Sequence, residues 1–361
     1  MEVMEISPNA WSGKRVLVTG HTGFKGAWLC HWLHQLGAEV AGLALDPATN
    51  PNLFVELRLA DLLAHDFRIN INNLGEVRSA FEVVKPEVVI HLAAQAIVID
   101  GYSDPVGTFS TNVLGTVNIL EAMRNTPGIC AALMVTSDKC YENELNVRPH
   151  LEEDRLGGAD PYSASKACAE MVVSSYQNSF LQQANTIMAT ARAGNVIGGG
   201  DWSAHRLIPD CIRSFEKGEP VILRNPDYVR PWQHVLDSLS GYLRLCELVM
   251  STNDNKYCGA WNFAPESASS ITVKEVARIA AETWGDGAQI VVERPEKAVK
   301  ESQFLQLDAT KAETQLNWRA HWGGLRGVER AIAWYRDVQA GMDARQACDR
   351  QLAEYVELLR S

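Results

Sequence analysis

The sequence predicts an α/β fold, a doubly wound parallel sheet with helices on both faces and a smaller C-terminal lobe. Short β-branched strands alternate with helical stretches up to about residue 195, and a glycine-rich turn joins the first strand to the first helix. Beyond that point the segments become Gly-rich, Pro-rich and aromatic. Alternating strands and helices build a parallel sheet, because each crossover helix returns the chain to the same edge. We therefore predict an N-terminal extension over 1–13, a sheet domain over 14–195, and a discontinuous lobe over 196–361 with segments that return to the sheet domain.

The elements follow in order along the chain. The first strand is "KRVLVTG", the first helix "AWLCHWLHQLG" ends at Gly37, and "AEVAGLALD" is the second strand, which together make one βαβ unit. Further strands are predicted at "DFRIN", "PEVVIHLAA", "CAALMVTS" and "NTIMATARAGNV". Further helices are predicted at "NVLGTVNILEAMRN" and "PYSASKACAEMVVSSYQNSF".

Composition excludes several classes of function. The chain has 361 residues, 46% of them hydrophobic, and a formal net charge of -11, which argues against a broad nucleic-acid surface. Eight scattered cysteines show no common metal spacing, so we predict reduced thiols and no metal. The start of the chain is acidic and lacks a long apolar run, so neither a signal peptide nor a membrane anchor is expected. We predict a cytoplasmic enzyme without a nucleic-acid or membrane partner.

The glycine-rich turn "TGHTGFKG" predicts a dinucleotide site. Glycines let the backbone approach a pyrophosphate, whose charge the N-terminus of the following helix favours. Turns of this kind also occur as plain joints between strand and helix, but the flanking strand and helix here favour a cofactor. The residues assigned to this turn are Gly20, Thr22, Gly23, Phe24, Lys25 and Gly26.

Carboxylates at the ends of the next two strands select the cofactor. Asp46 lies twenty residues after Gly26, where it can accept hydrogen bonds from both ribose hydroxyls and repel a 2'-phosphate, which favours NAD over NADP. Its other reading is a turn residue before Pro47. Asp66 and Phe67 are predicted to hold the adenine. Alternatively, Phe67 is an ordinary core residue.

A tyrosine and a lysine predict proton transfer. Tyr162 and Lys166 in "DPYSASKACAE" are four residues apart, so both project from one helix face. A nearby ammonium favours a phenolate, which can take a proton from a substrate hydroxyl as hydride leaves the same carbon. Ser137 supplies a second hydroxyl to that oxygen. Asn112 either braces the helix backbone or a relay water, or is a plain polar helix start. His91, after an apolar strand, is predicted to be a core residue.

Several motifs in order resemble one known family. "TGHTGFKG", "HLAAQ", "TNVLGT", "TSDKCY", "PYSASK" and "RAGNVIGGGDW" together resemble the extended short-chain dehydrogenase/reductase family, over residues 14 to about 335. Within that family, "SDKCYEN", "LGGADPYSASKACAE", "RAGNVIGGGDW" and "RPWQHVLD" are most similar to the enzymes that dehydrate CDP-glucose. The resemblance implies a Rossmann domain with tightly held NAD, a nucleotide-sugar lobe, and conversion of CDP-glucose to CDP-4-keto-6-deoxyglucose. It adds Ala93 and Ala94 to the cofactor site and Gln95 to the substrate site.

The resemblance also gives roles to the adjacent Asp138 and Lys139. Related dehydratases commonly carry an acid and a glutamate base at these two positions. We expect a protonated Asp138 to protonate the hydroxyl leaving sugar carbon 6, and a neutral Lys139 to remove the proton of carbon 5. Alternatively, Lys139 stabilises an enolate while another group moves the proton, or the pair is a helix-cap salt bridge. Two departures from the family pattern are Gly101, where a serine is expected, and the absence of a glycine before Asp66.

The substrate's diphosphate calls for guanidinium or amide donors. Arg206, Arg230 and Asn195 are the candidates, and Glu301 is predicted to accept from ribose hydroxyls. Either arginine has a surface salt bridge as its alternative. The cytidine preference depends on the resemblance of "RPWQHV" rather than on a derived contact.

Rival functions share parts of this site. A nucleotide-sugar 4-epimerase shares the tyrosine, lysine and NAD but needs no acid and base at carbons 5 and 6, and a 4,6-dehydratase of another nucleotide differs only in its base contacts. A non-catalytic NAD-sensing regulator is expected to lose Tyr162 or Lys166, and this chain keeps both. The resemblance further implies a homodimer or homotetramer and a place in bacterial deoxysugar biosynthesis, such as that of lipopolysaccharide O-antigen.

Overall fold

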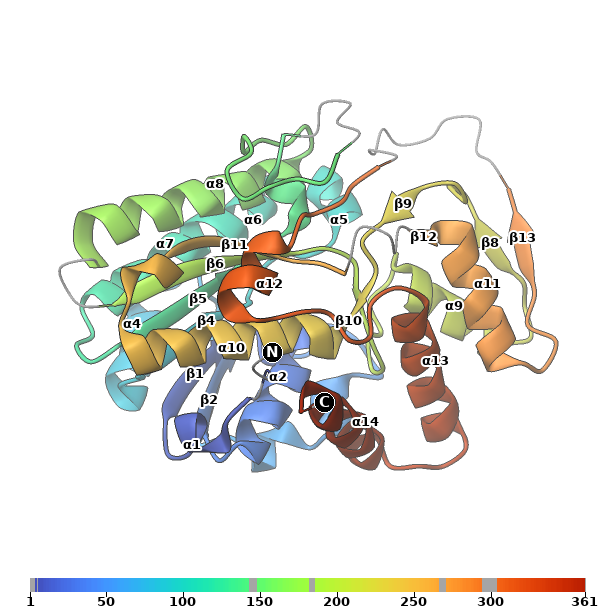
Figure 1. Cartoon of the computed structure of the whole chain (residues 1–361), viewed down its shortest axis with the longest axis horizontal. Helices are drawn as coiled ribbons and strands as arrows, with labels where there is room; N and C mark the ends of the chain where they lie inside the picture. The colour runs from blue at the N-terminus through green and yellow to red at the C-terminus, as the bar shows by residue number, and fades with distance from the viewer. Residues whose placement is uncertain are drawn as a thin grey trace.

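The computed structural model describes residue 4 and residues 6–142, 148–181, 186–265, 271–293 and 304–360. A large part built on one sheet lies at the left of Figure 1, and a smaller part with helices α9, α11 and α13 lies at the right. No helix within the described residues is long and apolar enough to cross a membrane.

The large part contains a seven-stranded sheet in the order β11-β6-β5-β4-β1-β2-β3, with every neighbouring pair parallel. Its strands are β1 (Arg15–Thr19), β2 (Glu39–Ala44), β3 (His65–Arg68), β4 (Val88–His91), β5 (Ala131–Val135), β6 (Ile187–Ala193) and β11 (Gly259–Phe263). The predicted α/β fold class is therefore confirmed. The edge strand β11 was not among the predicted strands, because its "GAWNF" is short and lies far along the chain from its neighbour β6.

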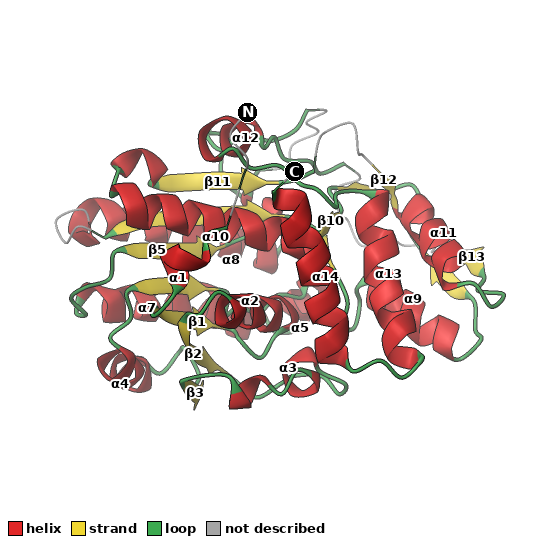
Figure 2. Ribbon diagram, turned by 60° about the horizontal axis from the view of Figure 1, so that its bottom comes forward, coloured by secondary structure: helices red, strands yellow, loops and turns green. Residues whose placement is uncertain are grey.

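Helices cover both faces of this sheet, as Figure 2 shows. Leu17 points into a core shared with helices α4, α7 and α8, while Val16 and Val18 point into a second core shared with α2 and α10. This alternation follows from the two-residue period of a strand. The helices of the large part are α2 (Phe24–Gln35), α3 (Leu53–Glu56), α4 (Leu74–Val84), α5 (Val98–Ser103), α6 (Pro105–Phe109), α7 (Gly115–Arg124), α8 (Pro161–Tyr176), α10 (Val235–Thr252) and α12 (Thr310–Leu316).

The first helix ends two residues before the predicted Gly37. Gly37 adopts a φ of +81°, a left-handed conformation that glycine accepts without strain and that cannot continue a helix. The stretch predicted as one helix from "NVLGT" onward is a π-helical turn, η2 (Ser110–Leu114), followed by α7.

The smaller part packs three helices against short strand pairs. Helix α11 contacts both α9 and α13, and the strands pair as β8 with β13, β9 with β12, and β7 with β10. Its elements are β7 (Val196–Ile197), α9 (Leu207–Glu216), β8 (Val221–Leu223), β9 (Val229–Arg230), β10 (Gln233–His234), β12 (Ile271–Thr272), α11 (Val273–Trp284), β13 (Ile290–Val292) and α13 (Leu325–Gln339). The domain boundary at residue 195 stays a prediction.

Both ends of the chain pack against the large part. Helix α1 (Pro8–Trp11) places the fully buried Trp11 on α10, where the indole nitrogen donates to Glu247 Oε1 at 2.8 Å. Helix α14 (Ala344–Leu359) reaches α2, where Asp349 Oδ1 lies 2.7 Å from His31 Nε2. The last helix of the chain thus supports the first helix of the sheet domain.

Candidate active site

The site lies at the carboxyl edge of the sheet. Strands β1, β2 and β3 extend one way from the centre and β4, β5 and β6 the other, so the crossover direction reverses between β1 and β4. Ligands of doubly wound sheets bind at this switch point, because the loops diverge there.

The glycine turn after β1 forms a cradle that side chains would fill. Gly20 has a φ of +76°, and a Cβ there would lie 2.8 Å from the backbone nitrogen of Ala93. A Cβ on Gly26 would lie 2.2 Å from the carbonyl oxygen of Gly20. Gly23 forms the N-cap of α2, and among the described residues no side chain caps it. This arrangement fits the pyrophosphate of NAD, which needs close backbone approach and an open helix N-terminus.

The other residues of the turn have separate contacts. The Thr22 hydroxyl donates to the carbonyl of Leu45 at 3.0 Å, which holds the turn against the end of β2. The Phe24 ring lies beside Gly198, where a Cβ would come within 3.0 Å of it. Lys25 Nζ donates to the Tyr242 hydroxyl at 3.3 Å, and burial, together with Arg206 and Lys166, lowers its pKa to about 7.

Two carboxylates lie where the adenosine half of NAD is expected. The Asp46 side chain is 87% exposed, 3.9 Å from Arg68 Nε, so its oxygens remain accessible to ribose hydroxyls. Asp66 instead accepts from Arg68 at 2.9 Å and lies 2.8 Å from Nε2 of the buried His21, in a partly buried pair that the sequence reasoning did not foresee. Phe67 is half-buried and packs against the core under α4.

Tyr162 and Lys166 lie on one face of α8, as the spacing predicts, and both are buried. Pro161 begins this helix, and the side chain of Asp160 caps it. Burial raises the pKa of Tyr162 to about 12, while a hydrogen bond with the Ser137 side chain acts in the opposite direction. Desolvation is the largest effect on the pKa of this tyrosine. That Lys166 favours the phenolate stays a prediction.

Lys166 has its own reason to titrate near neutrality. Its ammonium donates to the carbonyl of Val135 at 3.4 Å, and burial lowers its pKa to about 8. The Glu170 carboxylate, four residues further along α8, acts against that shift.

Asp138 and Lys139 lie in the short 3₁₀ turn η3 (Asp138–Cys140) directly beyond β5. Asp138 is buried, its Oδ1 accepts from the Ser137 hydroxyl at 2.9 Å, and its Oδ2 has no hydrogen-bond partner among the described residues. Burial raises the pKa of Asp138 above its ordinary value, although Lys139, Ser137 and Arg230 oppose the shift. A buried carboxyl group with a raised pKa has the protonation behaviour that a general acid requires.

Asn112 braces the site backbone. Its amide accepts from the backbone nitrogen of Gln95 at 2.8 Å and donates to the carbonyl of Gln95 at 3.0 Å and to Ser165 Oγ at 2.9 Å. Asn112 therefore braces the loop backbone at Gln95 rather than a helix backbone, and its role beside a relay water stays a prediction. The Gln95 side chain is bonded to the backbone of Ile97 at 2.8 Å and 3.0 Å. Ala93 donates its backbone N–H to Thr19 Oγ1 at 3.1 Å, which places Ala93 and Ala94 beside the glycine turn.

Basic residues from the smaller part face the same space. Arg206 Nη1 pairs with the buried Asp201 at 3.0 Å, and its charge acts on both Tyr162 and Lys25. Arg230 is buried, and its charge acts on Asp138. Asn195 follows β6 with a φ of +38°. Glu301 lies outside the described residues.

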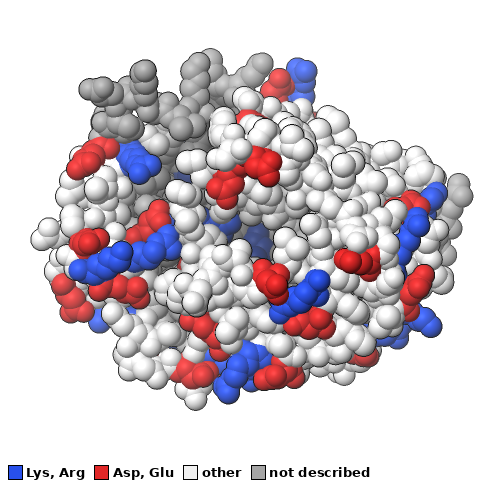
Figure 3. All heavy atoms as spheres, turned by 180° about the vertical axis from the view of Figure 1, so that it is seen from behind, with Lys and Arg blue, Asp and Glu red and all other residues white. Residues whose placement is uncertain are grey.

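The surface view agrees with a basic interior site in an acidic protein. Figure 3 shows a hollow near the middle of the face opposite to that of Figure 1, with Lys or Arg atoms visible at its floor. Among the described residues, no cluster of His, Cys, Asp and Glu side chains is arranged to hold a metal ion.

Sequence reasoning missed a buried ion pair under Lys166. Glu170 accepts from Arg192 Nε at 3.0 Å and Nη2 at 2.8 Å, and from Thr190 Oγ1 at 2.8 Å. Thr136, beside Ser137, donates to the same carboxylate. The spacing of Tyr162, Lys166 and Glu170, four residues each, was the available signal, because it puts all three on one helix face.

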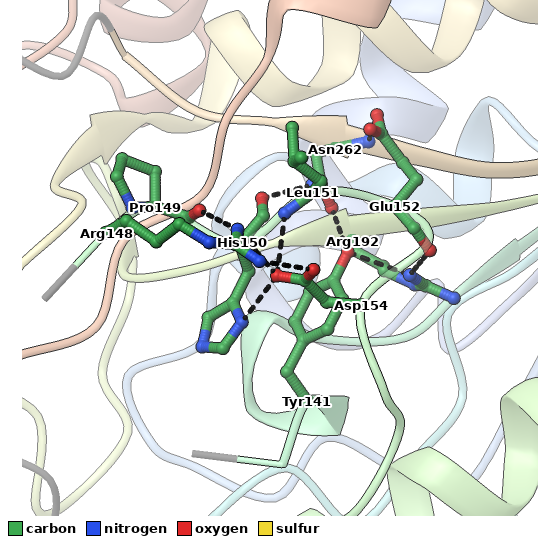
Figure 4. A network of polar contacts seen from close by, with 9 residues as sticks. All are labelled: Tyr141, Arg148, Pro149, His150, Leu151, Glu152, Asp154, Arg192 and Asn262. Atoms are coloured by element: carbon green, nitrogen blue, oxygen red, sulfur yellow. Dashed lines mark hydrogen bonds and ion pairs between the residues drawn. The ribbon is translucent and has the colours of Figure 1, made fainter. Parts of the chain in front are cut away.

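Arg192 extends this pair into the network of Figure 4. Its Nη1 donates to the Tyr141 hydroxyl at 2.8 Å and to the carbonyl of Glu152 at 2.9 Å. Tyr141 in turn donates to Asn262 on β11 at 2.7 Å, and its ring stacks on His150 with centroids 4.7 Å apart. Tyr141, which directly follows η3, is therefore bonded to side chains of both β6 and β11.

His91 is a core histidine, as predicted. Its two ring nitrogens lie 2.6 Å from Thr19 Oγ1 and 3.3 Å from Thr116 Oγ1. Burial lowers its pKa to about 3, so the ring is neutral.

Similar proteins of known identity share this architecture. The chain is 43% identical over 356 residues to a protein named CDP-glucose 4,6-dehydratase from Salmonella typhimurium, covering 97% of this chain and 98% of that protein. It is 24% identical to the dTDP-glucose 4,6-dehydratase of Haemophilus influenzae, over 89% of this chain and 97% of that one. The solved Thermus thermophilus UDP-glucose 4-epimerase, in complex with NAD, superposes with a TM-score of 0.74 at 26% identity, covering 89% of this chain and 99% of that structure. The family model described as GDP-mannose 4,6 dehydratase matches residues 17–331, so the chain belongs to that family.

Proposed function

We propose that this protein is an NAD-dependent nucleotide-sugar 4,6-dehydratase that converts CDP-glucose to CDP-4-keto-6-deoxyglucose and water. One observation carries the choice of substrate: the chain is 43% identical, along almost its whole length, to a relative named CDP-glucose 4,6-dehydratase. The dTDP-glucose 4,6-dehydratase relative of Haemophilus influenzae is only 24% identical.

The glycine cradle, the N-terminus of α2, Asp46 and Lys166 would hold NAD. When bound, NAD would accept a hydride from sugar carbon 4 and later return it to carbon 6. Asp46 is suited to accept hydrogen bonds from the ribose hydroxyls, because its carboxylate is exposed. The negative charge of the same carboxylate disfavours a 2'-phosphate.

Tyr162 takes the proton of the carbon 4 hydroxyl in this proposal. The phenol is fixed by α8, and the Ser137 hydroxyl bonded to it also orients the reacting oxygen. Only the phenolate of Tyr162 can take this proton, and burial disfavours the phenolate in the protein alone, so its formation needs nearby positive charge, which Lys166 supplies while it is protonated.

Asp138 and Lys139 then carry out the elimination. The ketone at carbon 4 makes the carbon 5 proton acidic, and Lys139 removes it. Asp138 protonates the hydroxyl at carbon 6, so the C–O bond breaks and water leaves. Its burial favours the protonated form that this role requires.

The diphosphate of the substrate is assigned to Arg206 and Arg230, with the amide of Asn195 as a further donor. Both guanidinium groups lie where they act electrostatically on catalytic side chains, so the phosphates would bind close to the reacting sugar. The two arginines come from the smaller part, which therefore serves as the substrate lobe.

The test is to incubate the purified protein with CDP-, dTDP-, UDP- and GDP-hexoses, with and without added NAD, and to follow product mass and 4-keto formation. Loss of one water from CDP-glucose without net NADH is the expected result. A product of unchanged mass would identify an epimerase, and water loss from another nucleotide sugar would reassign the base preference.

We also propose that the protein works in the cytoplasm as a homodimer. Exposed apolar side chains gather on α5, α6, η2 and α8 and the turn that follows it, namely Ile99, Val106, Phe109, Leu114, Met171 and Phe180. Such a surface on one side of a protein marks an association site. A Val106→Glu variant should be monomeric in light scattering at a concentration where the wild type is dimeric; a monomeric wild type would refute the proposal.

A further inference from the structure

The carboxyl group of Asp138 occupies a niche that a side chain at position 194 would close. Gly194 directly follows β6 and is buried. A Cβ on Gly194 would lie 2.0 Å from Asp138 Oδ2, 2.5 Å from its Cγ and 2.9 Å from Pro231 Cγ. These distances lie well inside contact range, so a residue larger than glycine and the present position of the Asp138 carboxyl exclude each other.

The backbone at Gly194 has little freedom to retreat. Ala193, just before it, is paired in the sheet with Phe263 of β11, and the carbonyl of Asn195, just after it, accepts from the backbone nitrogen of Gln233 at 3.3 Å. The carbonyl of Gly194 itself accepts from Gln233 Nε2 at 3.3 Å. An added methyl group must therefore displace the Asp138 side chain rather than the chain that carries it.

Conformation gives no other reason for a glycine here. Gly194 does not adopt a left-handed φ, whereas Gly200, six residues further along, has a φ of +80°. Alanine can adopt the backbone of residue 194 without strain. The reason for a glycine at this position is the close approach of the Asp138 carboxyl group and of Pro231.

We propose that Gly194 is a positioning residue for the acid step, because its missing side chain makes the room in which the Asp138 carboxyl group lies. This inference rests on the proposed dehydration of CDP-glucose. Ser137 holds Oδ1 at 2.9 Å, while Oδ2 is buried beside Gly194 and has no hydrogen-bond partner among the described residues, so the room at Gly194 fixes where the carboxyl group lies. A displaced carboxyl would leave oxidation at carbon 4 and proton removal at carbon 5 intact and slow only the loss of water.

The experiment compares Gly194→Ala with the wild type on CDP-glucose deuterated at carbon 5. We expect kcat for water loss to fall by about 10²-fold, as for a reactive group misplaced by about 1 Å. The recovered, unreacted substrate should lose deuterium to solvent faster relative to product formation than with the wild type. Gly75→Ala, where the new methyl would meet only Asn73 Oδ1 at 3.5 Å, is the control for the same chemical change and should behave as wild type.

Asp138→Ala supplies the decisive background, because it removes the group that the methyl would strike. Adding Gly194→Ala to Asp138→Ala should change neither kcat nor the exchange ratio further. Wild-type kcat in Gly194→Ala, or an equal further loss in both backgrounds, would overturn the inference. If Gly194→Ala fails to fold, recovery of folding in the double variant supports the clash with Asp138, and failure of both refutes it. A wild-type protein that releases no water from CDP-glucose would instead refute the proposed function.

Discussion

The buried pair of Glu170 and Arg192 should be a main support of the catalytic helix. Replacing Glu170 by glutamine leaves the Arg192 guanidinium buried, with its side chain only 4% exposed, and without a charged partner. Removing one member of a buried ion pair costs about 3–5 kcal/mol, because the remaining charge stays desolvated. Unfolding entropies of about 2.1 cal/mol/K per residue convert this into a melting temperature roughly 4–7 °C lower for a chain of 361 residues.

The assay is calorimetry of Glu170→Gln beside Glu282→Gln. Glu282 pairs with Arg278 on the surface, with side chains 57% and 51% exposed, and such pairs contribute only about 0–1 kcal/mol. The difference between the two variants isolates the effect of burial. A Glu170→Gln protein that melts within about 1 °C of the Glu282→Gln control would refute the reasoning.

The same variant should change the pH dependence of catalysis. Burial lowers the pKa of Lys166 and the Glu170 carboxylate raises it, and together they leave it at about 8. Without that carboxylate the pKa of Lys166 falls further, so the ammonium that assists Tyr162 is lost at a lower pH. The decline of kcat on the alkaline side should therefore begin at lower pH in Glu170→Gln, as a pH–rate profile of the folded variant will show. An unchanged decline on the alkaline side would show that Glu170 does not control the pKa of Lys166.

Four other changes have defined outcomes. Tyr162→Phe should lower kcat by about 10²–10⁴-fold with NAD binding retained, measured by steady-state kinetics and cofactor titration; near-normal turnover would exclude Tyr162 as the base at the carbon 4 hydroxyl. Lys139→Met should abolish exchange of the carbon 5 proton with solvent, followed by mass spectrometry, and exchange at the normal rate would show that another group is the base. Trp11→Ala should lower the free energy of unfolding by about 3–5 kcal/mol in urea, because a fully buried indole bonded to Glu247 is removed; a loss below about 1 kcal/mol would mean that the extension is not part of the core. Burial raises the pKa of Asp237 to about 6, so the folded state holds this proton more tightly than the unfolded state, and stability from this group should fall by about 2 kcal/mol as pH rises from 4 to 6. Asp237→Asn should lack this decline, and an identical pH dependence in both proteins would assign it elsewhere.

The sheet and the catalytic helix could be predicted because their signals are local. The glycine turn, the apolar strands and the spacing of Tyr162 and Lys166 each lie within a few residues of sequence, and the structure places them as expected. Motif order also sufficed to recognise the family that the comparisons confirm.

The missed features depend on contacts between distant segments. The pair of Asp66 with His21 joins residues 45 positions apart, and neither strand pattern nor motif indicates it. The niche at Gly194 needs the position of Asp138 in three dimensions, and β11 joins the sheet only through pairing with β6. The raised pKa of Tyr162 could not be predicted, because a sequence does not quantify burial, which here outweighs the hydrogen bond with Ser137.

The docking of α14 on α2 has a consequence for how the protein is made. In the helix that begins at the glycine turn, His31 meets Asp349, which lies 318 residues later in the chain. Contacts of such long separation form late, because the intervening chain must first be closed into a loop. The half of the sheet domain that receives the cofactor is therefore completed late in folding, and a chain truncated before residue 344 should lack the support that α14 gives to α2.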